Sequence, residues 1–156
     1  MAAPEVWGPH VWRLLHLLAD VSDRRDIFPL WNTFIKHTAL TIPCQKCQIH
    51  MKEYLTRTTF MPKGWDQMSA VQTRDAIRLR IHTFHNAVNE RLGKPQHPEL
   101  PADPTQHRTE ILLEITAVFE TVKSVWGRVA YISGPAFLEW KRCAQRLIQI
   151  VHAGPY

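Results

Sequence analysis

Apolar residues recur along the chain at intervals of three and four positions, the period expected of helices that bury one face. The first such run predicts a helix over about 9–20, and its apolar face carries Val11, Leu14, Leu15 and Leu18. A second run predicts a helix over 29–40. Pro43 favours an extended or turn conformation at the residue before it, so we expect a third helix to begin at Cys44 and to continue through Leu55.

The longest run predicts a fourth helix over 70–92, with an apolar stripe formed by Ile77, Ile81, Phe84, Val88 and Leu92. Gly93 is a natural C-cap for this helix, and Pro95 prevents its continuation. Residues 60–67 combine proline and glycine and predict a loop. Four prolines within 94–104 predict a linker or an ordered wrap.

Two further helical patterns cover about 106–126 and 134–152, and a Gly-Pro pair at 134–135 separates them. No stretch has the alternation typical of a strand, and no βαβ unit is indicated. The patterns together predict an all-α protein.

The composition is that of a globular domain: 156 residues, 45% of them hydrophobic. A chain of this length buries roughly 68–70% of its unfolded surface, so it does not need disulfides to hold a core together. The 19 Lys and Arg residues exceed the 14 Asp and Glu residues, which gives a net charge of +5. The positive residues are scattered and form no block of like charge, which is typical of a solvated surface, so we predict no nucleic-acid partner.

The first residues lack a charged segment followed by an unbroken apolar run, so we expect no secretion signal. Charged residues interrupt every apolar stretch within a few positions, and we therefore expect no membrane span. These features predict a cytoplasmic protein.

Three cysteines are too few for a disulfide scaffold, and two of them, Cys44 and Cys47, have the spacing C-x-x-C. At a helix start, backbone N–H groups stabilise a thiolate, and Lys46 adds a positive neighbour. The pair is therefore a candidate for thiol–disulfide exchange through a mixed disulfide. We expect Cys143 to be buried, because free cysteine behaves as a small hydrophobe and Leu147 lies on the same helix.

Two other interpretations of the cysteine pair stay open at this point. The pair with His50 has the spacing C-x2-C-x2-H and is a candidate zinc site, although a structural zinc needs four ligands and no second matching pair is present. The cysteines are alternatively two small buried residues on a helix. A thioredoxin-like protein is disfavoured, because that fold needs a parallel sheet.

A polar stripe follows one flank of the predicted fourth helix, formed by His82, His85, Asn86 and Asn89, with Lys94 one turn beyond. A solvent-exposed face is the plainer interpretation. However, His and Asn are poor helix formers, and Glu or Lys would suit an exposed face better. Flat polar side chains favour a planar ligand, and Trp12 and His16 on the first helix offer a similar surface.

Three motifs in this order resemble the Erv/ALR-type FAD-linked sulfhydryl oxidases. Residues 7–16, WGPHVWRLLH, resemble the family's G-x-x-x-W-x-x-L-H opening; residues 43–47, PCQKC, resemble its active disulfide; and residues 85–95, HNAVNERLGKP, resemble its H-N-x-V-N-x-x-L-G-K-P signature. The compact arrangement is similar to that of oxidases from large cytoplasmic DNA viruses of the iridovirus type.

The resemblance implies a four-helix bundle that holds FAD at its mouth over residues 1–95, with a Pro-rich connection and additional C-terminal helices over 96–156. It implies the catalytic pair Cys44 and Cys47 and no metal. The implied FAD-binding residues are Gly8, Pro9, His10, Trp12, His16, Cys47, His50, His82, His85, Asn86, Val88, Asn89, Leu92 and Lys94. His82 stands where some cellular members have a cysteine, so we expect their additional structural disulfide to be absent.

The implied reaction begins when a partner dithiol attacks Cys44 as the outer sulfur. Cys47 then passes electrons to FAD, and molecular oxygen takes them to give hydrogen peroxide. Many cellular members carry a second shuttle disulfide, which Cys143 alone cannot form, so we expect an external dithiol substrate, a small C-x-x-C redox protein. A homodimer is also implied. The alternatives are a zinc-stabilised interaction module and a non-catalytic dimeric scaffold built on the helices of 105–152.

Overall fold

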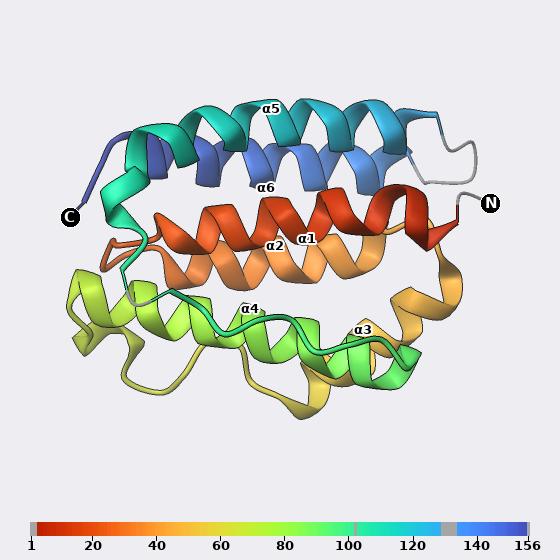
Figure 1. Cartoon of the computed structure of the whole chain (residues 1–156), viewed down its shortest axis with the longest axis horizontal. Coiled ribbons are helices and arrows are strands. Elements are labelled where there is room, and N and C mark those ends of the chain that lie inside the picture. Colours follow the sequence, from red (N-terminus) through yellow and green to blue (C-terminus); the bar gives the residue numbers. More distant parts are fainter. Residues whose placement is uncertain (1–2, 102, 129–133, 156) are drawn as a thin grey trace.

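Six α-helices are stacked as three layers of two helices each in the computed structural model of the protein, which describes residues 3–101, 103–128 and 134–155 (Figure 1). The middle layer holds α1 (Pro4–Asp20) and α2 (Phe28–Thr41), one outer layer holds α3 (Gln45–Arg57) and α4 (Ala70–Leu92), and the other holds α5 (Arg108–Gly127) and α6 (Gly134–His152). Short 3-10 helices lie at Trp65–Gln67 and Thr105–His107. No strand occurs within the described ranges, which confirms the all-α prediction.

The middle layer is apolar on two opposite sides. α1 packs against both α4 and α5, and α2 packs against both α3 and α6. In α1 the buried residues are Trp7, Val11, Leu14, Leu15, Leu17, Leu18 and Ala19, and they extend well beyond one stripe. A helix that is hydrophobic over most of its circumference has to be covered over most of it, so neither outer layer is sufficient alone.

α1 begins at Pro4, five residues before the predicted start at position 9. Proline is well suited to the first helical turn, since its missing N–H has no intrahelical partner there. Pro4 occupies such a position, whereas Pro9 lies inside the helix. The additional turn buries Trp7, whose ring lies edge-on to that of Trp126 on α5 with centroids 6.2 Å apart, and this tertiary burial stabilises it.

α4 has the predicted bounds because both ends are fixed locally. Ser69 and Gln72 form a capping box in which Ser69 Oγ accepts from the Gln72 amide at 3.1 Å and Gln72 Oε1 accepts from the Ser69 amide at 2.9 Å. At the other end Gly93 adopts a left-handed φ of 69°, which confirms it as the C-cap.

The linker after α4 folds back along that helix toward α5 (Figure 1). Arg78 anchors it: Arg78 Nη2 donates to the Pro101 carbonyl at 2.6 Å while Nε donates to Asp20 Oδ1 on α1 at 2.9 Å. Arg74 forms an ion pair with Asp103 at 3.6 Å. The prolines of 94–104 therefore belong to an ordered wrap.

The C-terminal helices add an aromatic cluster to the core. Trp140 on α6 is fully buried, its ring centroid lies 4.6 Å from that of Trp126, and its indole N–H donates to Thr38 Oγ1 on α2 at 3.0 Å. This hydrogen bond connects positions 102 residues apart in the chain. The division of the chain into units 1–95 and 96–156 stays a prediction.

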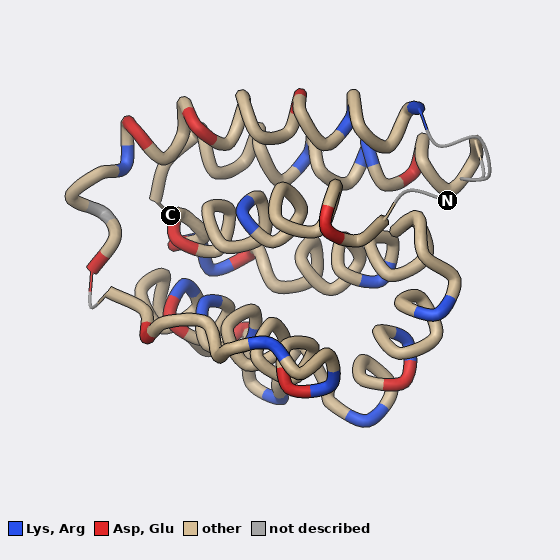
Figure 2. The backbone as a smooth tube through the Cα atoms, turned by 45° about the vertical axis from the view of Figure 1, so that its right-hand side comes forward, with Lys and Arg blue, Asp and Glu red and all other residues tan. Residues whose placement is uncertain are grey.

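Charged residues of both signs are interspersed along the backbone and do not gather on one side (Figure 2). This distribution agrees with the solvated surface expected from the sequence. Among the described residues, no helix is both long and apolar enough to cross a membrane.

We predict that Thr38→Val destabilises the protein by about 1–3 kcal/mol, because the buried indole N–H of Trp140 loses its acceptor while the side-chain shape is kept. Urea unfolding followed by tryptophan fluorescence measures the change. Thr33→Val, an exposed position on the same helix, is the control and should change stability by less than about 0.5 kcal/mol. Equal losses in the two variants would contradict the assigned role of Thr38.

Candidate functional site

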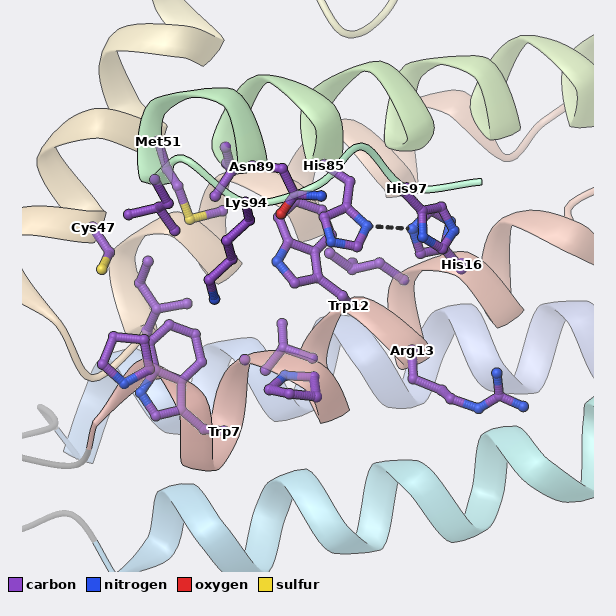
Figure 3. Close-up of a pocket in the computed structure, with 18 of the residues that line it drawn as sticks. Trp7, Trp12, Arg13, His16, Cys47, Met51, His85, Asn89, Lys94 and His97 are labelled. Carbon is purple, nitrogen blue, oxygen red and sulfur yellow. Dashed lines mark hydrogen bonds between the residues drawn. The ribbon is translucent and has the colours of Figure 1, made fainter. Parts of the chain in front are cut away.

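A cavity of about 530 Å³ lies between α1, the start of α3, the end of α4 and the linker. This volume falls in the range of roughly 300–1,000 Å³ that is usual for small-molecule sites. Figure 3 shows Cys47 near one end of it, His16 and His97 near the other, and Trp12, His85 and Asn89 between them. The predicted polar flank of α4 and the ring-bearing flank of α1 therefore do face one another.

Cys44 and Cys47 form a disulfide with Cα atoms 5.2 Å apart. Cys44 is the N-cap of α3, as its position after Pro43 predicts, and its Sγ accepts the Cys47 amide N–H at 3.2 Å. An amide of the first turn aimed at this sulfur favours its thiolate form after reduction. Cys47 lines the cavity, whereas Cys44 is buried and only 7% exposed.

The zinc interpretation of the cysteine pair finds no support in this geometry. His50 does not line the cavity that Cys47 lines. It lines a smaller hollow of about 150 Å³ together with Tyr54 and Phe84. In the described part of the chain, the group of possible metal ligands that converges is made of histidines of α1, α4 and the linker and does not include the cysteines or His50.

Stacked rings form the far end of the cavity. Trp12 on α1 and His85 on α4 are parallel within 5°, with centroids 4.1 Å apart. His16 Nε2 and His85 Nδ1 are 2.8 Å apart and share a hydrogen bond. His97 from the linker stacks on both histidines, with centroids 4.4 Å from His16 and 4.8 Å from His85. Four flat side chains from three segments thus make one aromatic surface.

These histidines are held in the neutral form. Burial, with smaller contributions from neighbouring histidines, lowers the pKa of His16 to about 3 and that of His85 to about 4. Burial also lowers the pKa of His97. Uncharged imidazoles suit contact with a flat, partly apolar ring better than imidazolium ions do.

Asn89 is the polar group that most clearly indicates a ligand. It is 8% exposed, it lines the cavity, and within the described residues its side-chain amide has no hydrogen-bond partner. The amide is accessible from the cavity, so it offers hydrogen-bond donors and an acceptor to a bound molecule. Lys94 and Arg91 line the same cavity and offer positive charge to an anionic group.

Ten of the fourteen predicted cofactor-binding residues line this one cavity: Gly8, Pro9, Trp12, His16, Cys47, His85, Val88, Asn89, Leu92 and Lys94. The structure places the other four, His10, His50, His82 and Asn86, outside its lining. His10 is an exposed residue of α1.

His82 and Asn86 instead hold the linker. Asn86 Oδ1 accepts the backbone N–H of His97 at 2.6 Å, and His82 Nε2 lies 3.0 Å from the Pro98 carbonyl oxygen and 3.3 Å from that of His97. The polar stripe of α4 therefore has two roles along its length. One part faces the cavity, and the other part satisfies a peptide backbone.

Several lining residues were not predicted, among them Met51, Arg13 and His97. Arg13 forms an ion pair with Glu114 of α5, which ties the cavity wall to the C-terminal layer. His97 is a single histidine among prolines with no periodic neighbours, so only the path of the linker reveals its position. Its one sequence signal is its closeness to the end of the third motif at Pro95.

Cys143 is half-buried on α6 and is a free thiol, whereas we expected it to be buried. Burial raises its pKa, so the unreactive thiol form is favoured. Its neighbour Leu147 is buried, whereas its neighbour Leu138 is 43% exposed. Cys143 therefore lies at the edge of the covered face of α6.

The model of the Erv1 / Alr family matches residues 9–113, which is 105 of the 156 residues. The chain belongs to the Erv1/Alr family. This confirms the resemblance inferred from the three motifs, and the match extends past the last motif into α5.

Several viral proteins are similar to this chain. It is 32% identical over 99 residues to a putative FAD-linked sulfhydryl oxidase of Invertebrate iridescent virus 6, covering 62% of this chain and 87% of the relative. It is 32% identical over 96 residues to a protein of the same description from Invertebrate iridescent virus 3, covering 60% of each chain. It is 28% identical over 92 residues to an FAD-linked sulfhydryl oxidase of African swine fever virus, covering 56% of this chain and 69% of the relative. No solved structure matches this chain significantly.

We predict that the free energy of unfolding falls as the pH is lowered from 6.5 toward 4, because His16 and His85 are buried in the neutral form. The unfolded state takes up protons near the ordinary histidine pKa of 6.5, whereas folded His16 and His85 resist protonation down to pKa values of about 3 and 4. Their contribution is complete above pH 6.5 and is lost as the pH falls toward 4. The melting temperature of His16→Asn should therefore decrease less between pH 8 and pH 5 than that of the wild type. His107→Asn, at an exposed site, should match the wild type; a slope for His16→Asn as steep as the wild-type slope would contradict the assignment.

We predict that Asn86→Ala loosens the linker and leaves α4 intact, because it removes the acceptor of the His97 amide. Hydrogen–deuterium exchange at the His97 amide should become roughly 2- to 10-fold faster, the effect of losing one hydrogen bond. Thr83→Ala, at an exposed position of α4, is the control. Unchanged exchange in Asn86→Ala would show that this bond does not hold the linker.

Proposed function

We propose that the protein is an FAD-dependent thiol oxidase that forms disulfides in protein substrates through the pair Cys44–Cys47. The observation that supports this most directly is the disulfide itself, because Cys47 opens onto a ligand-sized cavity with aromatic walls. The relatives' description as FAD-linked sulfhydryl oxidases supports the same activity. FAD is the cofactor.

The residues around the cavity fit FAD by their chemistry. Trp12 and His85 offer ring faces to its flat systems, and the unpartnered amide of Asn89 offers a donor and an acceptor. Lys94 and Arg91 would hold its pyrophosphate through opposite charge. The ten predicted residues that line the cavity are the proposed contacts. His10, His50, His82 and Asn86 lie outside the lining, and their contact with FAD stays a prediction.

The cysteine pair performs the exchange steps. A thiolate of the substrate attacks Cys44, and Cys47 leaves as a thiolate toward the cavity. Because Cys44 is only 7% exposed, its sulfur has to become more accessible before the substrate attacks it. The second thiol of the substrate then resolves the mixed disulfide, and the Cys47 amide stabilises the released Cys44 thiolate.

Bound FAD supplies the remaining chemistry, which is acceptance of two electrons from a dithiol and reduction of molecular oxygen to hydrogen peroxide. The chain's own contribution is position. Neutral His16 and His85 keep positive charge away from this part of the cavity, and the C-terminal layer keeps α1 in place.

The substrate is a protein dithiol, and a small redox protein with its own C-x-x-C pair is the proposed shuttle. The reason is that the single free cysteine, Cys143, offers no second disulfide within the described residues to relay electrons. A cytoplasmic location and a homodimer, both expected from the sequence and the resemblance, stay predictions.

Anaerobic reduction tests the proposal directly. The purified protein should be yellow, and addition of dithiothreitol without oxygen should bleach its flavin absorption. Admission of air should restore the colour and produce hydrogen peroxide, measured with a peroxidase-coupled dye. A colourless protein that takes up no added FAD would refute the proposed activity.

Cysteine variants separate the roles of the three thiols. We predict that Cys44→Ser and Cys47→Ser each reduce oxygen consumption with dithiothreitol to background while FAD stays bound, since the cavity wall is otherwise unchanged. Cys143→Ser is the matched control and should keep wild-type turnover, because its thiol lies on α6 outside the cavity lining. Full turnover by either of the first two variants would show that the pair is not the redox site.

A further inference from the structure

We propose that His16, His85 and His97 form a binding site for a divalent transition-metal ion such as Zn²⁺, and that this ion and FAD exclude one another. The competition with FAD rests on the proposed function, whereas the ion site rests on the geometry of the three histidines alone. The site would bind the ion when the cavity holds no cofactor.

The spacing of the ring nitrogens carries the proposal. One nitrogen from each of the three histidines lies within 4.8 Å of the other two, and the His16 Nε2–His85 Nδ1 distance is 2.8 Å. Two nitrogens that bind one tetrahedral zinc ion at about 2.0–2.1 Å are roughly 3.3 Å apart. The 2.8 Å distance is shorter than this value and the 4.8 Å limit is longer, so small side-chain rotations bring three nitrogens to one ion.

The three ligands come from three segments of the fold, which fixes them in space. His16 lies on α1, His85 on α4 and His97 on the linker (Figure 3). The backbone of His97 is held by Asn86 and His82 through the contacts described above. Such supporting bonds orient the ligands of metal sites and contribute strongly to their affinity.

The chemistry of the site matches the ion. Neutral imidazole is the form that binds Zn²⁺, Ni²⁺ and Cu²⁺. The hydrogen bond between His16 and His85 requires a proton on one of the two facing nitrogens. On binding, this proton moves to the other nitrogen of the same ring, and no net charge changes. All three side chains line the cavity, so the fourth position of the ion faces open space where a water molecule fits.

Exclusion of FAD follows from shared atoms. The nitrogens of His16 and His85 that converge on the ion are also among the groups that the cofactor would contact. An ion there fixes the closed stack of His85 on Trp12, with centroids 4.1 Å apart, and leaves no gap for another ring between them.

Cobalt is the probe for the test, because tetrahedral Co²⁺ absorbs visible light. The full-length protein is stripped of flavin, checked for helicity by circular dichroism, and kept without reductant so that Cys44 and Cys47 stay paired. We expect one equivalent of Co²⁺ to bind with a tetrahedral spectrum that lacks sulfur-to-metal bands. Added Zn²⁺ should displace it.

His97→Phe is the diagnostic variant, since it keeps a stacking ring and removes the ligand nitrogen. We expect its Co²⁺ affinity to fall at least about 100-fold, more than the loss of an outer-shell bond causes. His97→Asn serves as a second variant if the phenyl ring disturbs folding. His107→Phe, at an exposed histidine outside the cluster, should bind Co²⁺ like the wild type.

Competition is measured in both directions. FAD should release bound Co²⁺ from the wild type in a one-to-one ratio. Zn²⁺ added to the flavin-loaded protein should increase the amount of FAD released at equilibrium, detected by flavin fluorescence and suppressed by a chelator. Absence of Co²⁺ binding, or equal affinity in wild type and His97→Phe, would overturn the ion site and leave the oxidase proposal standing. Co²⁺ that stays bound beside FAD would overturn the exclusion and show that the cofactor does not use these histidines.

Discussion

The fold depends on one constraint: α1 and α2 are apolar on two opposite sides, so both sides have to be covered. The outer layers α3–α4 and α5–α6 meet this need from either side. The C-terminal layer supplies part of the same core, since Trp126 of α5 and Trp140 of α6 are completely buried. Burial of each large apolar side chain stabilises the fold by roughly 1.5–3 kcal/mol. The C-terminal layer therefore contributes substantially to the stability of the helices that carry the site.

The same constraint positions the cavity. α1 is held from two sides by its buried leucines, so the flank between them, with Trp12 and His16, has a fixed orientation toward α4 and the start of α3. The disulfide is positioned in the same way, because α2 packs against α3 and Pro43 ends the one helix just before Cys44 caps the other. The same helices thus provide both the core packing and most of the site. The linker provides the rest of the cavity lining, at Lys94, His97, Leu100 and Pro101.

How much the sequence predicts depends on how local each feature is. The bounds of α4 follow from a capping box and from Gly93, which act within a few residues, and both ends were predicted correctly. The start of α1 was wrong because burial of Trp7 against a distant helix extends it. His82 and Asn86 were expected to face a cofactor, and in this structure they hold the linker, so their contact with a cofactor stays a prediction. A peptide backbone and a planar ligand present the same hydrogen-bonding groups, so a polar stripe alone does not distinguish them.

The pairing of layers also has a consequence for synthesis of the chain. The hydrogen bond from Trp140 to Thr38 joins residues 102 positions apart, and α5 covers α1 over a similar separation. The apolar backs of the first two helices therefore stay uncovered on the ribosome until the last helix has emerged. At roughly 5–20 residues per second this takes several seconds, during which the nascent chain exposes an adhesive surface. The two central helices, α1 and α2, are made first and are shielded last.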